Sequence, residues 1–189
     1  YGTVNIAASH VDANTASYSG GGIYNGGGAL SVSTSTISGN SAYDGGGIYT
    51  SGYSTAITGN TIANNFGGGL TLDAYYAYVT SNAITGNIGD GIRVWGSNNT
   101  IGTVEPDAGN AISNNTAAGI AVFGTMNAIR GNTINSNGGL AIDLDGDGNP
   151  DGVQHDDDGQ EAHNHQASPD QPRAVTSRRS CQPLRVCLG

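Results

Sequence analysis

Aliphatic residues and asparagines recur along this chain in one fixed order. The order is Ile-x-x-Asn-x-Ile-x-x-Asn, then a short variable stretch, then Gly followed by two aliphatic positions with one residue between them, as residues 57–72 and 79–94 show most clearly. The second asparagine of the pattern falls at Asn14, Asn40, Asn65, Asn87, Asn115 and Asn137, so successive copies are 26, 25, 22, 28 and 22 residues apart. Self-similarity at such a period is typical of repeat architectures and not of flexible glycine linkers.

The alternation of aliphatic and polar positions within each copy predicts short β-strands. A period near 22 built from several short strands predicts a parallel β-helix, an all-β solenoid of about six rungs that occupies residues 1–142. Successive rungs should stack at about 4.8 Å, with the aliphatic columns filling the interior. The 28-residue step contains residues 103–109, whose Pro106, Asp107 and Gly109 predict an inserted loop.

The repeated asparagines and glycines have structural explanations. Asparagine tolerates turn conformations, and its amide both donates and accepts hydrogen bonds, so stacked copies can bond the rungs above and below. A polar binding ladder is the alternative interpretation, but a structural ladder is favoured. The repeated glycine marks a position that needs positive φ or a close backbone approach.

Composition narrows the class of protein. The chain has 189 residues, 32 of them glycine, no lysine, 11% charged residues and a net charge of −9. Such a composition disfavours a helical fold, because glycine, asparagine, serine and threonine are poor helix formers. It also disfavours nucleic-acid binding, which needs clustered basic residues. No apolar run approaches the length of a membrane span, so no transmembrane segment is expected.

Charge divides the rest of the chain into two segments. Residues 143–165 hold eight acidic residues and no arginine, whereas residues 166–189 hold one aspartate, four arginines and both cysteines, Cys181 and Cys187. Residues 166–189 match no rung, and an irregular, poorly ordered tail is expected there.

The acidic segment contains a pattern that is typical of calcium loops. Carboxylates alternate along it with a glycine, Gly148, at the place where a sharp turn is needed, and this arrangement can curl around a hard cation. The expected Ca²⁺ ligands are Asp143, Asp145, Asp147, Asn149 and Asp151. The alternative is a polar cap that ends the solenoid and discourages end-to-end stacking.

The strand after the repeated glycine supplies the candidate ligand-binding surface. Counted from the glycines, one outward column is expected to read Tyr24, Tyr49, Thr71, Arg93, Ala121 and Ala141, and the next Gly26, Ser51, Asp73, Trp95, Phe123 and Asp143. Outward aromatic rings beside a carboxylate and an arginine suit sugar recognition, since rings stack on a pyranose and polar groups fix its hydroxyls. The predicted ligand-binding residues are Tyr49, Asp73, Tyr75, Tyr76, Arg93, Trp95 and Phe123.

Two other interpretations of this surface stay open. It can be an ordinary solvated face on which aromatic side chains shield the sheet and an Arg–Asp pair contributes little. It can also hold a polysaccharide lyase or epimerase, in which case Asp73, Asp90 and Arg93 would be the catalytic group. No catalytic residue is otherwise assigned, because the carboxylates of the first five rungs fall in different columns and hydrolysis needs a convergent pair.

The segments "NTASYSGGGIYNGG" and "NSAYDGGGIYTSG" resemble the repeats of bacterial right-handed β-helix surface proteins, which include the polymorphic outer-membrane protein class and secreted proteins of the CSLREA type. The segments "NNTIGTVEPDAGNAISNN" and "GGLAIDLDGDGNPDG" resemble later rungs of the CSLREA-type group. The resemblance implies a right-handed coil and an extracellular or cell-surface location. With it we expect a non-enzymatic module that binds a polysaccharide or cell-surface glycan, or else a structural spacer; the oligomeric state stays open.

Overall fold

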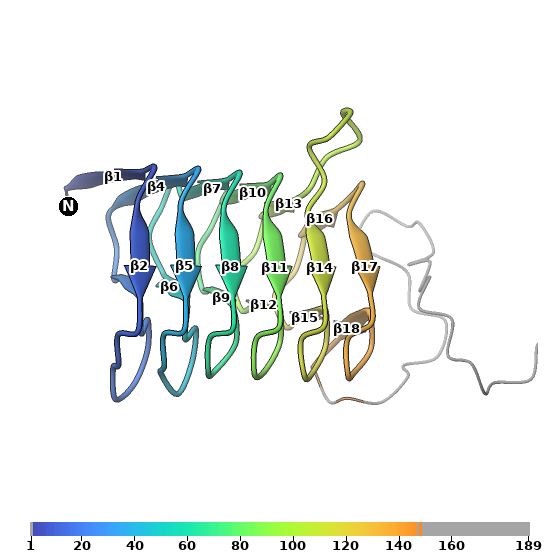
Figure 1. Ribbon diagram of the computed structural model, residues 1–189. Helices are drawn as coiled ribbons and strands as arrows, with labels where there is room; N and C mark the ends of the chain where they lie inside the picture. Colours follow the sequence, from blue (N-terminus) through green and yellow to red (C-terminus); the bar gives the residue numbers. More distant parts are fainter. Residues whose placement is uncertain (1, 147, 149–189) are drawn as a thin grey trace, which may run out of the picture.

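Three flat parallel sheets run along the length of the molecule and enclose a narrow interior (Figure 1). The computed structural model describes residues 2–146 and 148. The predicted calcium ligands Asp147, Asn149 and Asp151, and the tail with its two cysteines, lie outside the described residues. None of the described residues belongs to a helix that is long and apolar enough to cross a membrane.

Each sheet takes one strand from every turn of the chain, in sequence order. The first sheet consists of β1 (Thr3–Ala7), β4 (Ala29–Ser33), β7 (Ala56–Thr58), β10 (Tyr78–Thr80), β13 (Thr100–Ile101) and β16 (Ala128–Ile129). The second consists of β2 (His10–Asp12), β5 (Thr36–Ser38), β8 (Thr61–Ala63), β11 (Ala83–Thr85), β14 (Ala111–Ser113) and β17 (Thr133–Asn135). The third consists of β3 (Ile23–Asn25), β6 (Ile48–Thr50), β9 (Leu70–Leu72), β12 (Ile92–Val94), β15 (Ile120–Val122) and β18 (Ile142–Leu144).

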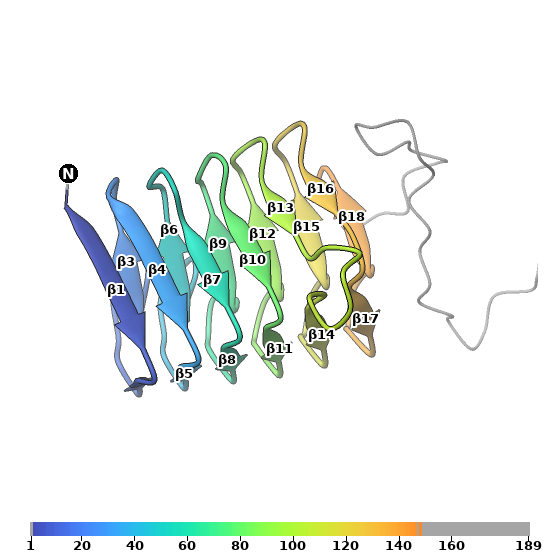
Figure 2. The same ribbon diagram turned by 90° about the horizontal axis from the view of Figure 1, so that it is seen from above.

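One strand from each sheet makes one rung, so the three six-stranded sheets form six rungs, as the repeat predicted. Rung 1 is β1–β3 and rung 6 is β16–β18. The inserted loop of residues 103–109 was also predicted correctly: it contains no strand and projects from the solenoid after β13 (Figure 2). Because the insertion leaves the rung at one turn, the strands on either side keep their register.

Stacked aliphatic side chains fill the interior. Each column is in register across the rungs, as with Ile37, Ile62, Ile84 and Ile112 in the second sheet, all of which are fully buried. The end rungs are less covered, and Ile6, Val11, Ile134 and Leu144 are only partly buried. A single rung cannot bury its own side chains, so the stability of the fold depends on stacking.

Asparagine ladders join the rungs at the turns, which confirms their structural interpretation. At Asn87, Oδ1 accepts hydrogen bonds from both the backbone N–H and the side-chain amide of Asn65, while Nδ2 donates to the Ile62 carbonyl and to Asn115 Oδ1, at 2.9–3.1 Å. The same pattern links Asn60, Asn82 and Asn110 at a second turn. Every amide in the middle of a ladder is therefore satisfied although it is buried.

The repeated glycine is required by close approach and not by its φ angle. Gly47, Gly69 and Gly91 are absent from the positive-φ glycines. A Cβ added at Gly69 would lie 2.7 Å from the Gly91 carbonyl oxygen and 2.9 Å from Asn87 Nδ2. A methyl group at this column would push apart both the backbone and the asparagine ladder of adjacent rungs.

The register of the last rung differs from the prediction. Counting from Gly139 placed Ala141 and Asp143 in the two outward columns, but β15 pairs with β18 so that Ala121 faces Asp143. The backbone N–H of Gly119 bonds to Leu140 and that of Ile120 to Ala141, so Ala141 occupies the glycine column. In the described part of the chain no further rung stacks on Ala141, and the methyl group is tolerated there.

Candidate functional site

The outward face of the third sheet carries the predicted aromatic and charged residues. The strands are short, with a buried aliphatic residue at the first position and an inward residue at the third, which is Asn25, Thr50 or Val94, so the middle residue points outward: Tyr24, Tyr49, Arg93 and their equivalents. The residue directly after each strand also lies outward, and Asp73, Trp95 and Phe123 continue the ladder there through backbone bonds to the preceding rung. The predicted columns are thus confirmed for rungs 1–5.

Two pairs of aromatic rings stack along this face. Tyr24 and Tyr49 have ring centroids 5.4 Å apart and nearly parallel planes, at 8°. Trp95 and Phe123 are closer, at 3.9 Å and 18°. Tyr24 and Trp95 remain about half exposed, at 63% and 47%. The structure therefore brings Tyr49, Trp95 and Phe123 of the prediction into stacks, and adds Tyr24 to them.

Rung 3 separates the two stacks and carries small polar side chains. The Tyr49 hydroxyl donates a 3.0 Å hydrogen bond to Asp73 Oδ2. Burial, and then this hydrogen bond with the nearby Asp73 charge, raise the pKa of Tyr49 to about 12. Tyr49 therefore stays a neutral donor across the physiological range, and Asp73 lies between Tyr49 on one side and Trp95 on the next rung.

Arg93 forms its ion pairs with the loops that precede the strands. Its Nη2 and Nε lie 2.8 and 2.9 Å from Asp90 Oδ2, and its Nη1 lies 3.3 Å from Asp44 Oδ1. The same Asp44 oxygen accepts a 2.8 Å hydrogen bond from Thr71. Asp90 uses its other oxygen to accept a bond from the backbone N–H of Ala118. Asp44, Thr71, Asp90 and Arg93 thus form one network that ties rungs 2, 3, 4 and 5 together.

Asp44 was not among the predicted site residues. It lies three residues before Gly47, whereas Asp90 lies one residue before Gly91, so the two carboxylates occupy different columns in the sequence. They meet only because the long arginine side chain reaches back two rungs. The available signal was the arginine on the outward face of this sheet: in a chain without lysine, nearby carboxylates are expected to pair with it.

Tyr75 and Tyr76 lie in the turn between β9 and β10, beside the third sheet and not on it. Tyr75 forms a β-bridge with Tyr53 of the preceding rung, and Tyr76 has a φ of 57°. Both are exposed. They extend the aromatic surface around the corner from Asp73 towards the first sheet.

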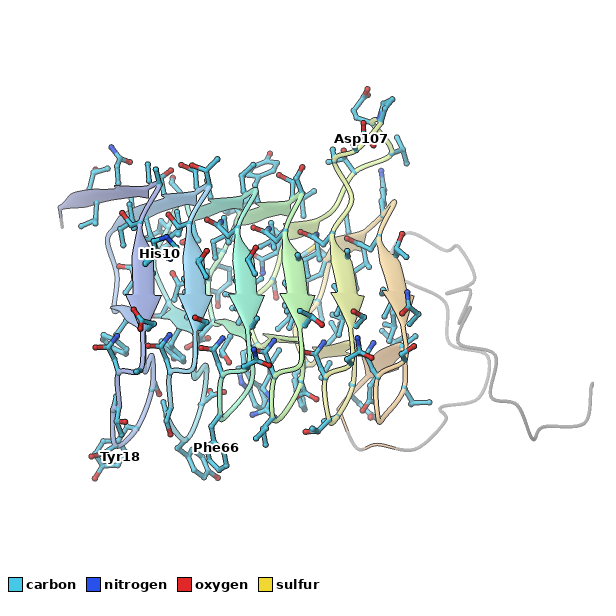
Figure 3. The ribbon with its side chains drawn as sticks, viewed as in Figure 1. His10, Tyr18, Phe66 and Asp107 are labelled. Carbon is cyan, nitrogen blue, oxygen red and sulfur yellow. The ribbon has the colours of Figure 1, made fainter. Side chains whose placement is uncertain are left out.

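Other exposed residues lie elsewhere on the molecule. Tyr18 and Phe66 occupy the tips of the loops that follow the second sheet, His10 lies on that sheet, and Asp107 lies on the inserted loop (Figure 3). Within residues 2–146 and 148, no three carboxylate, histidine or cysteine side chains are grouped so that they could hold a metal ion. Of the expected calcium ligands only Asp143 and Asp145 are described, and Asp143 Oδ2 accepts a 3.0 Å bond from the Gly148 N–H.

Comparison with known proteins agrees with this architecture. A family model described as a right-handed β-helix region matches residues 2–106. No curated protein and no solved structure gave a match. The family match covers more than half of the chain, and the six stacked rungs have the architecture that it describes, so the chain belongs to the right-handed β-helix family.

Proposed function

We propose that this chain is a non-enzymatic, extracellular or cell-surface module that binds a glycan on the outward face of its third sheet. The observation that carries the proposal is the pair of partly exposed aromatic stacks, Tyr24–Tyr49 and Trp95–Phe123, on either side of the polar rung that holds Asp73. Aromatic faces pack against the C–H groups of a pyranose, while carboxylate and hydroxyl groups between them bind its hydroxyls.

A binding role accounts for the carboxylates better than catalysis does. Asp90 is buried, and both of its oxygens are engaged, by Arg93 and by the Ala118 N–H. Arg93 in turn contacts two carboxylates, so its charge is already compensated. A lyase or epimerase that used Asp73, Asp90 and Arg93 would first have to break this network, and the geometry therefore favours a binding module.

A glycan array followed by calorimetric titration tests the proposal. The intact chain is expected to bind at least one glycan class, and Trp95→Leu should weaken that binding by about tenfold, which corresponds to about 1.4 kcal/mol for the lost ring stacking. Tyr18→Leu is the matched control, because Tyr18 is an exposed aromatic residue on a distant loop tip.

The result decides between the proposed function and a structural spacer. A chain that binds no glycan on the array, or a Trp95→Leu variant that binds as tightly as the parent, would contradict the glycan-binding role. The same glycan hits, incubated with the chain and examined for shortened or unsaturated products, would reveal an enzyme if one is present.

A further inference from the structure

Asp73 lies in a gap between the two aromatic stacks. The stacked pairs belong to rungs 1 and 2 and to rungs 4 and 5. Trp95 follows its strand in the same column as Asp73, so the ring face that Phe123 leaves free is turned towards Asp73. Tyr49 lies in the neighbouring mid-strand column and reaches Asp73 with its hydroxyl group. One rung spacing, about 4.8 Å, separates the backbone at Asp73 from the backbone at Trp95. We call Tyr49, Asp73 and Trp95 the Asp73 platform.

The far side of the Trp95 stack is closed. A Cβ at Gly146 would overlap the ring of Phe123, so the chain at Gly146 passes directly over that ring. The remaining accessible face of this stack is therefore that of Trp95, towards rung 3. A ligand that uses the stack lies over Asp73.

The charge at the platform is negative. Asp73 accepts a hydrogen bond from the neutral Tyr49 hydroxyl, which leaves its charge in place. Arg93, the cation on the described part of this sheet, is directed towards Asp44 and Asp90, which more than balance it. An anionic sugar such as a uronate would be repelled here, whereas a cation beside the Trp95 ring and the Asp73 carboxylate is stabilised by both.

Among pyranose sugars, the cationic class is that of hexosamines with a free, protonated amino group. We propose that the Asp73 platform recognises such a unit, with the ammonium group bound by the Asp73 carboxylate and the sugar ring packed on the free face of Trp95. This specificity rests on the glycan-binding function proposed above and adds the class of sugar.

The test is a calorimetric titration of the full chain with three tetramers, of glucosamine, N-acetylglucosamine and galacturonic acid. The glucosamine tetramer is expected to bind at least tenfold more tightly than the other two, and more weakly at high salt because the ion pair is partly exposed. Asp73→Asn keeps an acceptor for the Tyr49 hydroxyl but removes the charge, and should abolish the preference for glucosamine. Asp73→Ser, which reproduces the residue type of Ser51 one rung earlier, provides a second variant if the first one fails to fold.

Asp12→Asn is the matched control, because it removes one negative charge from an exposed position on the second sheet. Equal losses in Asp12→Asn and Asp73→Asn would mean that the acidic chain attracts the cationic tetramer as a whole, and would overturn the inference. Tighter binding of the N-acetylated or uronate tetramer, still sensitive to Trp95→Leu, would overturn the hexosamine specificity but leave glycan binding intact. Failure of all three tetramers and of the glycan array would contradict both proposals.

Discussion

At the scale of single residues, the buried asparagine ladders carry an unusual share of the hydrogen bonding between rungs. The side chain of Asn87 takes part in four such bonds and is fully buried. Asn87→Ala removes its own groups, leaves the backbone N–H of Asn65 without its acceptor, and takes one donor away from the Ile62 carbonyl. An unsatisfied buried group costs about 1–3 kcal/mol, so we expect a loss of about 2–4 kcal/mol in the free energy of unfolding, measured by urea titration.

Asn5→Ala is the appropriate comparison for Asn87→Ala. Asn5 lies on an edge strand, β1, and its side chain is exposed. Its substitution should change the free energy of unfolding by about 0.5 kcal/mol or less. If Asn87→Ala were as stable as Asn5→Ala, the ladder would be incidental to stability.

Tyr49 makes the free energy of unfolding depend on pH in the alkaline range. Its pKa is raised by burial and by the hydrogen bond to Asp73 from 10.0 to about 12 in the folded chain. Between these two values the unfolded chain loses the Tyr49 proton while the folded chain keeps it, so stability is unaffected below pH 10 and falls as the pH rises from 10 towards 12.

Tyr49→Phe should therefore flatten the loss of stability between pH 10 and pH 12, measured as the change in unfolding free energy. Tyr43→Phe is the control, since Tyr43 is 84% exposed. An equally steep decline in the parent chain and in Tyr49→Phe would show that the hydrogen bond to Asp73 does not hold the hydroxyl proton.

At the scale of strands and turns, the sequence predicted the rungs well because few residue types fit the inward positions. The narrow interior admits stacked aliphatic side chains, and the turns admit asparagine, so both columns could be counted directly from the sequence. The register of β18 was missed because the count relied on glycine, and Ala141 replaces glycine where no described rung stacks on it. Glycine is needed at this column because the backbones of adjacent rungs pack closely, and this requirement ends at the last rung.

The Arg93 network joins strands that are far apart in sequence, and its energy can be measured. Arg93→Ala leaves the buried Asp90 without its cation and is expected to cost about 1–3 kcal/mol of unfolding free energy. Arg93→Lys should recover only part of this, because lysine cannot bind two carboxylates with the fork of a guanidinium group. A double-mutant cycle with Asp44→Asn then isolates the longer contact, which is partly exposed and should contribute less than 1 kcal/mol. A coupling free energy that is larger for the Arg93–Asp44 pair than for the Arg93–Asp90 pair would contradict this ranking of the two contacts.

At the scale of the whole molecule, the sequence predicted which residues share the candidate surface, but not which side chains contact one another there. Strand alternation and register bring Tyr49, Asp73 and Trp95 to one face, and this follows from the repeat alone. The partners of Arg93 depend on side-chain rotamers and on loops that differ between rungs, and column counting does not include them. The sequence therefore located the surface, while the charge of the Asp73 platform required the structure.

Calcium binding at the C-terminal end is the remaining prediction from the sequence. Asp143 lies on β18, at the last rung, and the Gly148 N–H bonds back to its carboxylate, so the chain turns there as a cation loop would require. Further ligands would have to come from Asp147, Asn149 and Asp151. A cation bound there would hold the chain after β18 against the last rung, where Leu144 is only partly buried, and would stabilise the stack from its end.

Thermal unfolding with Ca²⁺ and with a chelator tests this effect on the whole molecule. At a Ca²⁺ concentration of about 100 times its Kd, the folded chain would gain about 2.7 kcal/mol, and the midpoint should rise by several degrees. Mg²⁺ at the same concentration controls for ionic strength. Asp145→Asn combined with Asp147→Asn should remove the shift, whereas Asp12→Asn combined with Glu105→Gln changes the net charge equally at distant positions and should retain it. An unchanged midpoint in the parent chain would leave the acidic segment as a polar cap, which discourages end-to-end stacking through its charge alone.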